Sequence, residues 1–171
     1  TSVVLPDSLT SISNYAFMSC SSLVNIEFPG SLTSIGDYAF HCCPLFRITL
    51  PQGLTHIGDY AFQNCAFTEI DLPDALTHIG DYAFAHCPVS ELTIPNGVTT
   101  IGGYAFQNWL ITEVIVPDSV TSIGNEAFKN CTSLKRINYL GTEEQWNKIT
   151  KGYGWDEDTG DYTIVYNYTE E

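Results

Sequence analysis

The chain has 171 residues, of which 44% are hydrophobic and 15% are charged, and this is enough for one folded domain. Its 20 acidic and 6 basic side chains give a formal net charge of −14. DNA, RNA and anionic membranes attract clustered Lys and Arg, so this composition disfavours all three as partners. No apolar stretch approaches the roughly 20 residues of a membrane helix, and we expect no membrane insertion.

One phrase recurs six times along the chain. It reads LTSIGDYAFHCCPLFRITLP from Leu32 to Pro51 and LTHIGDYAFQNCAFTEIDLP from Leu54 to Pro73. A fixed period of this size indicates a solenoid, in which each unit buries its apolar side against its neighbours. A proline ends each unit, at Pro6, Pro29, Pro51, Pro73, Pro95 and Pro117.

Two short extended segments are expected in each unit. The residues three and one before the proline are apolar, as in Ile26 and Phe28, and the residue between them is mostly polar, which predicts a half-buried strand. Proline then ends the strand because it has no N–H for the ladder. A second apolar pair, such as Leu32 and Ile35, flanks Thr-Ser or Thr-His and predicts another short strand on a different side of the coil.

A turn carrying Tyr-Ala-Phe follows these strands. Asp37, Asp59 and Asp81 precede it directly, and Asp before a short apolar turn is typical of a helix N-cap. We therefore expect a brief helical or 3₁₀ turn here. One aromatic residue per unit is expected to form a stacked spine inside the coils, with coils ~4.8 Å apart: Phe17, Phe40, Phe62, Phe84, Phe106 and Phe128.

These residues make the chain resemble the BspA-type leucine-rich repeat family of bacteria over roughly residues 1–140. The resemblance implies an α/β repeat solenoid of about six coils of 22–23 residues, with short parallel strands, short helical or 3₁₀ turns and a C-terminal helix–strand cap. Trp109 in the Cys slot and Glu126 in the Tyr slot depart from the family phrase, and we interpret both as local packing adjustments.

The C-terminal segment departs from the period. Thr142-Glu-Glu-Gln145 has the pattern of a capping box, Trp146 and Ile149 share one face of the short helix that should follow, and residues 162–166 read as a final strand. The family's last segment is similar. We therefore divide the chain into a leucine-rich repeat solenoid at residues 1–139 and a C-terminal cap at residues 140–171.

The cysteines allow three interpretations: a ladder of buried thiols, disulfides between neighbouring coils, or a metal site. We favour the ladder, because parallel stacked side chains have poor torsions for bridging and no CxxC pair is present. Cys42 is an additional cysteine next to Cys43. The other five cysteines share one slot of the repeat: Cys20, Cys43, Cys65, Cys87 and Cys131.

Other titratable residues favour no catalytic or metal site. His56 and His78 share a slot but lack a third ligand, and the Asp column is explained by capping. The loop from Asp156 to Asp161 lacks the Gly and the final Glu of a calcium loop. No nucleophile motif or phosphate loop is present. We expect no enzyme, no cofactor and no metal.

The outward residues of the strand before each proline are the candidate protein-binding site. Such a face is the usual docking surface of a repeat array, and its carboxylates favour a basic partner, although simple solvation of the strands explains the charges equally well. The candidate residues are Asn25, Glu27, Arg47, Thr49, Glu69, Asp71, Glu91, Thr93, Glu113 and Ile115.

Two functions follow from the sequence. The first is a non-enzymatic module that binds a protein ligand, in host matrix or on another cell surface; the second is a structural spacer that presents a neighbouring domain. The resemblance implies an extracellular or cell-surface location and a role in adhesion. The chain opens at Thr1 inside an expected strand, so we expect a portion of a longer protein, monomeric but able to pair through this edge.

Overall fold

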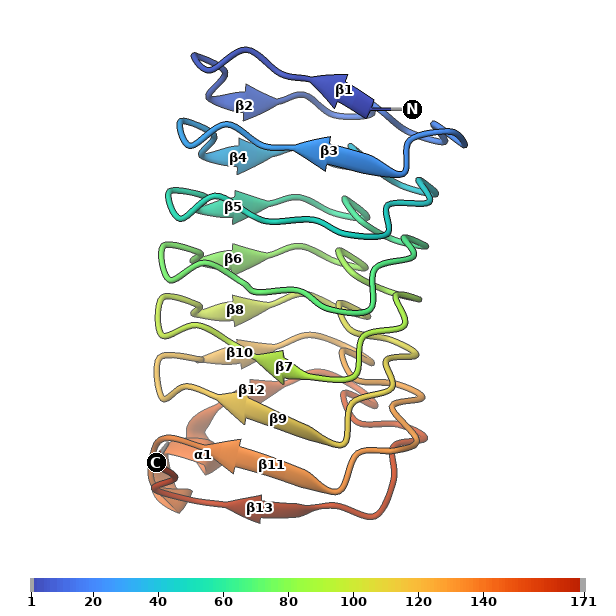
Figure 1. Ribbon diagram of the computed structural model, residues 1–171. Coiled ribbons are helices and arrows are strands. Elements are labelled where there is room, and N and C mark those ends of the chain that lie inside the picture. Colours follow the sequence, from blue (N-terminus) through green and yellow to red (C-terminus); the bar gives the residue numbers. More distant parts are fainter. Residues whose placement is uncertain (1, 170–171) are drawn as a thin grey trace.

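The computed structural model describes residues 2–169, with side chains from residue 3, and shows a chain wound into a stack of coils (Figure 1). One wall of the stack, here called the rear sheet, is a seven-stranded parallel sheet. It places Ser34 beside His56 and Ile35 beside Ile57, so the second predicted strand is confirmed. Its strands are β2 (Ser11–Ile12), β4 (Ser34–Ile35), β5 (His56–Ile57), β6 (His78–Ile79), β8 (Thr100–Ile101), β10 (Ser122–Ile123) and β12 (Thr150–Lys151).

The opposite wall, here called the front sheet, contains the strands that precede the prolines. It is parallel but falls into two pieces, β1-β3 and β7-β9-β11-β13. Between them only a bridge from Asn25 to Arg47 is present, so the expected strands of the third and fourth coils make no ladder in the described part of the chain. The strands are β1 (Ser2–Val4), β3 (Asn25–Glu27), β7 (Leu92–Thr93), β9 (Glu113–Val116), β11 (Arg136–Tyr139) and β13 (Thr163–Val165).

The Tyr-Ala-Phe segments are not the helical or 3₁₀ turns that we expected. Tyr38 has φ 55° and Cys42 has φ 56°, whereas both helical conformations need negative φ. The Tyr38 N–H donates to the Asp59 carbonyl and the Phe40 N–H to the Ala61 carbonyl, each at 2.8 Å. These amides bond between coils, so a local helix cannot use them, and each segment becomes a pair of turns instead.

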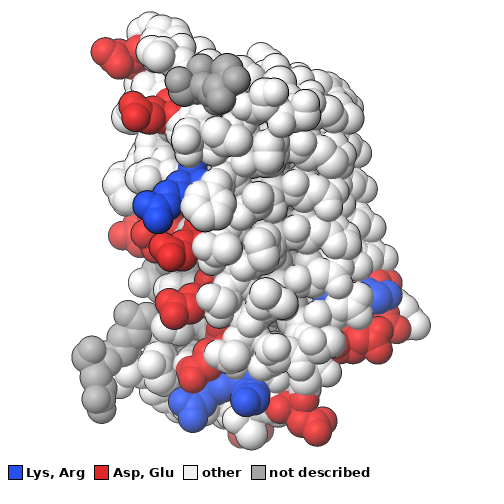
Figure 2. Space-filling view, turned by 45° about the vertical axis from the view of Figure 1, so that its right-hand side comes forward, with Lys and Arg blue, Asp and Glu red and all other residues white. Residues whose placement is uncertain are grey.

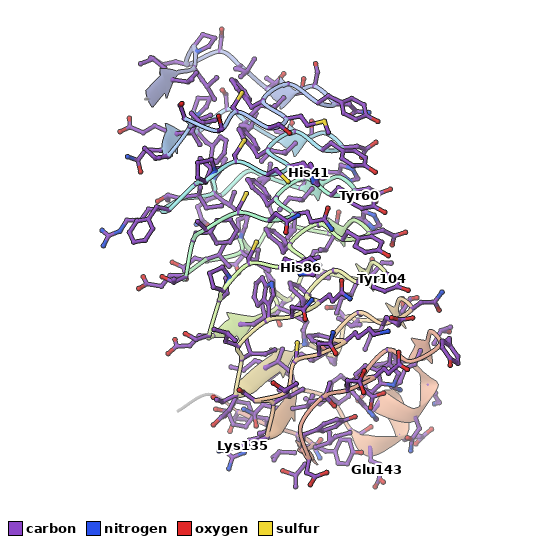
Figure 3. All side chains as sticks on the ribbon, turned by 90° about the vertical axis from the view of Figure 1, so that its right-hand side faces the viewer. His41, Tyr60, His86, Tyr104, Lys135 and Glu143 are labelled. Atoms are coloured by element: carbon purple, nitrogen blue, oxygen red, sulfur yellow. The ribbon has the colours of Figure 1, made fainter. Side chains whose placement is uncertain are left out.

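The Tyr-Ala-Phe turns of successive coils stack into a column, here called the turn column. The backbone hydrogen bonds that the Tyr-slot amides make to the neighbouring coil all run in one direction. The N–H always belongs to the earlier coil and the carbonyl to the next one: Tyr15 to Asp37, Tyr38 to Asp59, Tyr60 to Asp81, Tyr82 to Gly103, Tyr104 to Asn125 and Glu126 to Tyr153. The Phe slot and the slot before Cys repeat the same direction. Figure 3 looks onto these turns, with Tyr60 and Tyr104 labelled.

The aspartates before these turns do not cap them, which corrects the N-cap interpretation. The Asp59 Oδ1 atom accepts the backbone N–H of Asp81 at 2.8 Å, and the Asp81 Oδ1 atom accepts the N–H of Gly103 at 2.6 Å. Asn14 and Asn125 do the same toward the following coil. The side chains therefore continue the hydrogen bonding between coils, and Asp and Asn are interchangeable in this role.

The core confirms the aromatic spine. Consecutive rings of the six expected phenylalanines lie 5.2 to 6.1 Å apart between centroids, with interplanar angles from 1° to 27°. The rings of five tyrosines form a second, partly exposed stack at 4.3 to 5.1 Å. This stack ends at Glu126, whose carboxylate pairs with Lys129 at 2.5 Å, and that ion pair accounts for the departure in the Tyr slot.

The cysteines of the repeat slot are free thiols. Cys43, Cys65, Cys87 and Cys131 are buried, and each thiol donates to the Phe carbonyl of the preceding coil, at 2.9 to 3.4 Å. Trp109 keeps this bond, because its Nε1–H donates to the Phe84 carbonyl at 2.7 Å. The structure thus favours the ladder over disulfides.

The C-terminal segment continues the winding. Helix α1 (Glu143–Lys148) begins with the expected capping box between Thr142 and Gln145, and its residue Trp146 is buried. β12 and β13 extend the rear and front sheets, so residues 140–169 complete a seventh coil where we expected six coils. The domain division at residue 140 stays a prediction, and Thr1, Glu170 and Glu171 lie outside the described residues. In the described part of the chain no helix has the length and apolarity to cross a membrane.

Candidate binding face

The ten candidate residues lie on the front sheet and on the extended segments that bridge its two pieces. Nine of them are exposed and Ile115 is partly buried, because the pleat turns alternate side chains outward. Asn138, the outward residue of β11, is instead buried, and its Nδ2 donates to Glu113 Oε2 at 3.1 Å. The side chain of Ser2, which begins the same column, lies outside the described side chains.

Carboxylates dominate this face. Glu69, Asp71 and Glu91 are exposed on consecutive coils and make no ion pair within the described residues. The carboxylate of Glu113 lies 3.8 Å from the guanidinium of Arg136. Both side chains are exposed, so the attraction between them is weak. Figure 2 shows acidic side chains in a row along the left border of the molecule, with basic side chains among them and a largely uncharged surface beside them; a further group of acidic and basic side chains lies at the right.

The front sheet is hollowed along its interrupted part, and also between the paired strands β1 and β3. A groove of about 790 Å³ runs between residues 25–30 and 47–53, and two hollows of about 280 Å³ follow between the third and fourth coils and between the fourth and fifth coils. Ile48, Ile70 and Leu72 are partly exposed there, whereas Leu92 and Val114, in the paired part of the sheet, are buried. The hollows therefore combine apolar floors with carboxylate rims.

The sequence did not reveal these hollows. Ile48 and Ile70 follow the same pattern as Leu92, so no local signal distinguishes an open strand from a paired one. Beside the groove, Val24 and Phe46 are exposed apolar side chains on consecutive coils. Their slot is polar or charged in later coils, and this compositional change is a signal that could have marked the apolar end of the face.

The remaining titratable candidates form no metal site. The rings of His56 and His78 stack at 5.3 Å, and within the described residues no group of three His, Cys, Asp or Glu side chains could hold a metal ion. In the acidic C-terminal loop, Asp156 accepts the hydroxyl of Tyr162 at 2.5 Å and Glu157 pairs with Lys129 at 2.8 Å. Hydrogen bonds to Glu126 and Glu157 hold the pKa of Lys129 well above its usual range.

A parallel stack of coils with a Leu, Ile and Phe core and an exposed front sheet defines a leucine-rich repeat solenoid. Residues 1–66 and 55–152 match the BspA type leucine rich repeat region in six copies, and the chain belongs to this family. No curated protein matches the chain.

The solved structures that are similar to this one include two leucine-rich repeat proteins. A leucine-rich repeat protein of T. pallidum is 30% identical, with a TM-score of 0.78, and the match covers 90% of this chain and 73% of that one. A leucine-rich repeat protein from Bacteroides ovatus is 33% identical, with a TM-score of 0.71, over 80% of this chain and 39% of that one. This chain thus spans less than half of the B. ovatus protein.

Proposed function

We propose that the chain is a non-enzymatic recognition module that binds a protein ligand through the front sheet. The observation that carries this proposal is the combination of unpaired carboxylates with apolar hollows along the interrupted part of that sheet. Apolar floors supply binding energy through burial, and charged rims supply orientation and faster encounter. Repeat proteins of this family and fold are typically non-enzymatic, and nothing in the described residues points to catalysis.

The ligand that fits this surface presents basic side chains. Glu69 and Asp71 lie on one coil and Glu91 on the next, so Lys or Arg side chains of an extended segment could pair with them in succession. The hollows between coils then take the apolar side chains that alternate with the basic ones. Arg47 at the upper end of the row limits how far such a segment extends toward β3.

The family context supports a place outside the cell. BspA-type repeats occur in bacterial surface proteins, and we infer from this membership a role in adhesion to host matrix proteins or to another cell. We therefore place this module in a secreted or surface-anchored protein, with adhesion as its task. A structural spacer is the competing role, because coils that share one continuous core would also extend a neighbouring domain from the surface.

Replacing Glu69, Asp71 and Glu91 together by Ala separates the two roles. Binding of immobilised extracellular-matrix proteins and of a Lys-rich peptide, measured by surface plasmon resonance at low and high salt, should fall at least about tenfold in this variant. The control replaces Asp118, Glu143 and Asp161 by Ala, which removes the same charge from exposed positions outside the ten residues. Equal binding by wild type and both variants would favour the spacer.

A further inference from the structure

One backbone hydrogen bond of the front sheet is lost where the sheet is interrupted. In the paired part of the sheet, the Ile94 N–H donates to the Ile115 carbonyl of the next coil at 3.0 Å. Phe28 and Thr49 occupy the same two slots of the repeat, one residue and two residues before the proline. Within the described residues the corresponding bond is absent from three successive gaps between coils: Phe28 to Thr49, Leu50 to Asp71 and Leu72 to Thr93.

A hollow lies at each of these three gaps. The largest is the groove of about 790 Å³, which Phe28 and Thr49 line together, and the other two hollows have about 280 Å³ each. Figure 1 shows no arrows on the front of the third and fourth coils, between β3 and β7. The main-chain groups that bond between coils elsewhere in the sheet therefore border open space here.

The opening is confined to the front of the stack. At the same coils the rear sheet pairs β4 with β5 and β5 with β6, and the turn column keeps its hydrogen bonds. The groove begins just beyond the bridge between Asn25 and Arg47. The N–H and the carbonyl of Thr49 and the N–H of Phe28 make no backbone hydrogen bond within the described residues. The solenoid thus presents free main-chain donors and an acceptor on its front while the other walls hold the coils together.

We infer that this groove takes up an extended peptide as an added strand, held by main-chain hydrogen bonds; the inference rests on the proposed function of the front sheet. A free strand edge binds an extended peptide through its main chain, and the pockets beside it select alternate side chains. A peptide carbonyl accepts the Phe28 N–H on one side of the groove, and a peptide N–H donates to the Thr49 carbonyl on the other side. The peptide thereby replaces the bond that Ile94 and Ile115 make in the paired part of the sheet.

The side chains around the groove favour a peptide of alternating apolar and basic residues. Ile48 is partly exposed in the groove, and Phe46 is 57% exposed beside it. Glu27 on the rim makes no ion pair within the described residues, and neither do the two carboxylates of the fourth coil, so Arg47 balances one of three negative charges. Successive side chains of a strand point to opposite faces, so valines of such a peptide contact Ile48 while its lysines remain near the carboxylates.

Amide hydrogen exchange, measured by NMR with and without the peptide Lys-Val-Lys-Val-Lys-Val, tests the inference. In the free protein the amides of Phe28 and Thr49 should exchange fast and that of Ile94 slowly; bound peptide should slow the first two at least about tenfold and leave Ile94 unchanged. Slow exchange of Phe28 and Thr49 in the free protein, or unchanged exchange with the peptide bound, would overturn the inference alone. No binding of the peptide in surface plasmon resonance would overturn the proposed function and the inference together.

Methylated peptides test the main-chain bonds without changing the protein. Methylation of the backbone nitrogens of the three lysines removes N–H donors from one edge of the peptide, and affinity should fall at least about tenfold. The matched control carries one methyl group on each lysine side-chain nitrogen, which keeps the charge, and its affinity should stay within about twofold of the unmodified peptide. Equal affinities of the two methylated peptides would show that the peptide binds through its side chains, against the inference.

Discussion

The Nε1–H of Trp109 donates to the carbonyl oxygen of Phe84 at 2.7 Å, in the place where other coils use a thiol. Cys87 makes the equivalent bond to the Phe62 carbonyl at 3.2 Å, and Cys131 to the Phe106 carbonyl at 3.3 Å. An indole and a thiol thus fill one slot because each brings a single donor to a buried carbonyl. The slot therefore requires a hydrogen-bond donor, and side chains of different volume can supply it.

Trp109→Phe should therefore destabilise the protein although it keeps an aromatic ring in the core. The Phe84 carbonyl would lose its indole donor, and an unpaired buried acceptor costs about 1–3 kcal/mol. Urea unfolding followed by far-UV circular dichroism measures this loss. Leu110→Ala, at the exposed neighbouring position, is the control and should change stability by less than about 0.5 kcal/mol. Equal stability of Trp109→Phe and wild type would show that the donor is dispensable.

Gly80→Ala should be strongly destabilising because the coils leave no space for a methyl group. A Cβ atom at Gly80 would lie 2.6 Å from the carbonyl carbon of Gly58 and 2.7 Å from the backbone nitrogen of Asp59. Backbone atoms cannot move aside without opening the stack, so we expect a loss of about 1–3 kcal/mol or more. Thermal unfolding measures it.

Gly30→Ala is the matched control for that substitution. A Cβ atom at Gly30 would meet nothing within 4 Å, so its melting temperature should equal that of the wild type or rise slightly. Similar losses in the two variants would mean that glycine flexibility, and not the close approach of the coils, explains the glycine at position 80.

Asp59→Asn should preserve the side-chain ladder, and Asp59→Ala should break it. The Asp59 Oδ1 atom accepts the N–H of Asp81, and an amide oxygen does the same at Asn14 and Asn125. We expect Asp59→Ala to lose about 1 kcal/mol, whereas Asp59→Asn should be neutral, or slightly stabilised at low salt because one charge leaves the column. Melting temperatures at two salt concentrations test both, and equal effects of the two variants would contradict the ladder.

Stability should fall at alkaline pH because of the buried thiols. Burial raises the pKa of Cys87 from 9.0 to about 12, so the folded chain keeps a proton that the unfolded chain releases. This contribution is fully present below about pH 9 and decreases between pH 9 and 12, by up to about 1.4 kcal/mol per pH unit. Urea unfolding under reducing conditions should show a shallower decline for Cys87→Ala; identical slopes would contradict the assignment.

The period of the sequence was sufficient to predict the coils. Ile35 and Ile57, one period apart, lie side by side in the rear sheet, and Phe40 stacks on Phe62 in the spine. Apolar spacing predicts such contacts because each unit has only its neighbours as partners. The exposed positions of the front sheet follow from the same alternation, so nine of the ten candidate residues could be placed outside the core from sequence.

The turns and the ends of the period were harder to predict. Asp before Tyr-Ala-Phe favours an N-cap locally, but the amides concerned bond to the next coil, and no local propensity encodes that partner. The seventh coil was not predicted because residues 140–160 do not repeat the sequence pattern of the other coils. Gly152 alone keeps its place, next to Gly124 of the preceding coil. Likewise, Ile48 and Ile70 fit the strand pattern although their coils make no ladder, so the hollows of the candidate face needed the structure.

The one-way hydrogen bonds of the turn column give the stack an electrical polarity. In an ordinary sheet neighbouring peptide dipoles largely cancel, but here every peptide that joins the Asp and Tyr slots has the same orientation, so their dipoles add along the solenoid axis. The N–H groups point toward the last coil, where Asp156, Glu157 and Asp158 follow Gly154. Acidic side chains thus lie at the partially positive end of the column, as they do at the start of an α-helix.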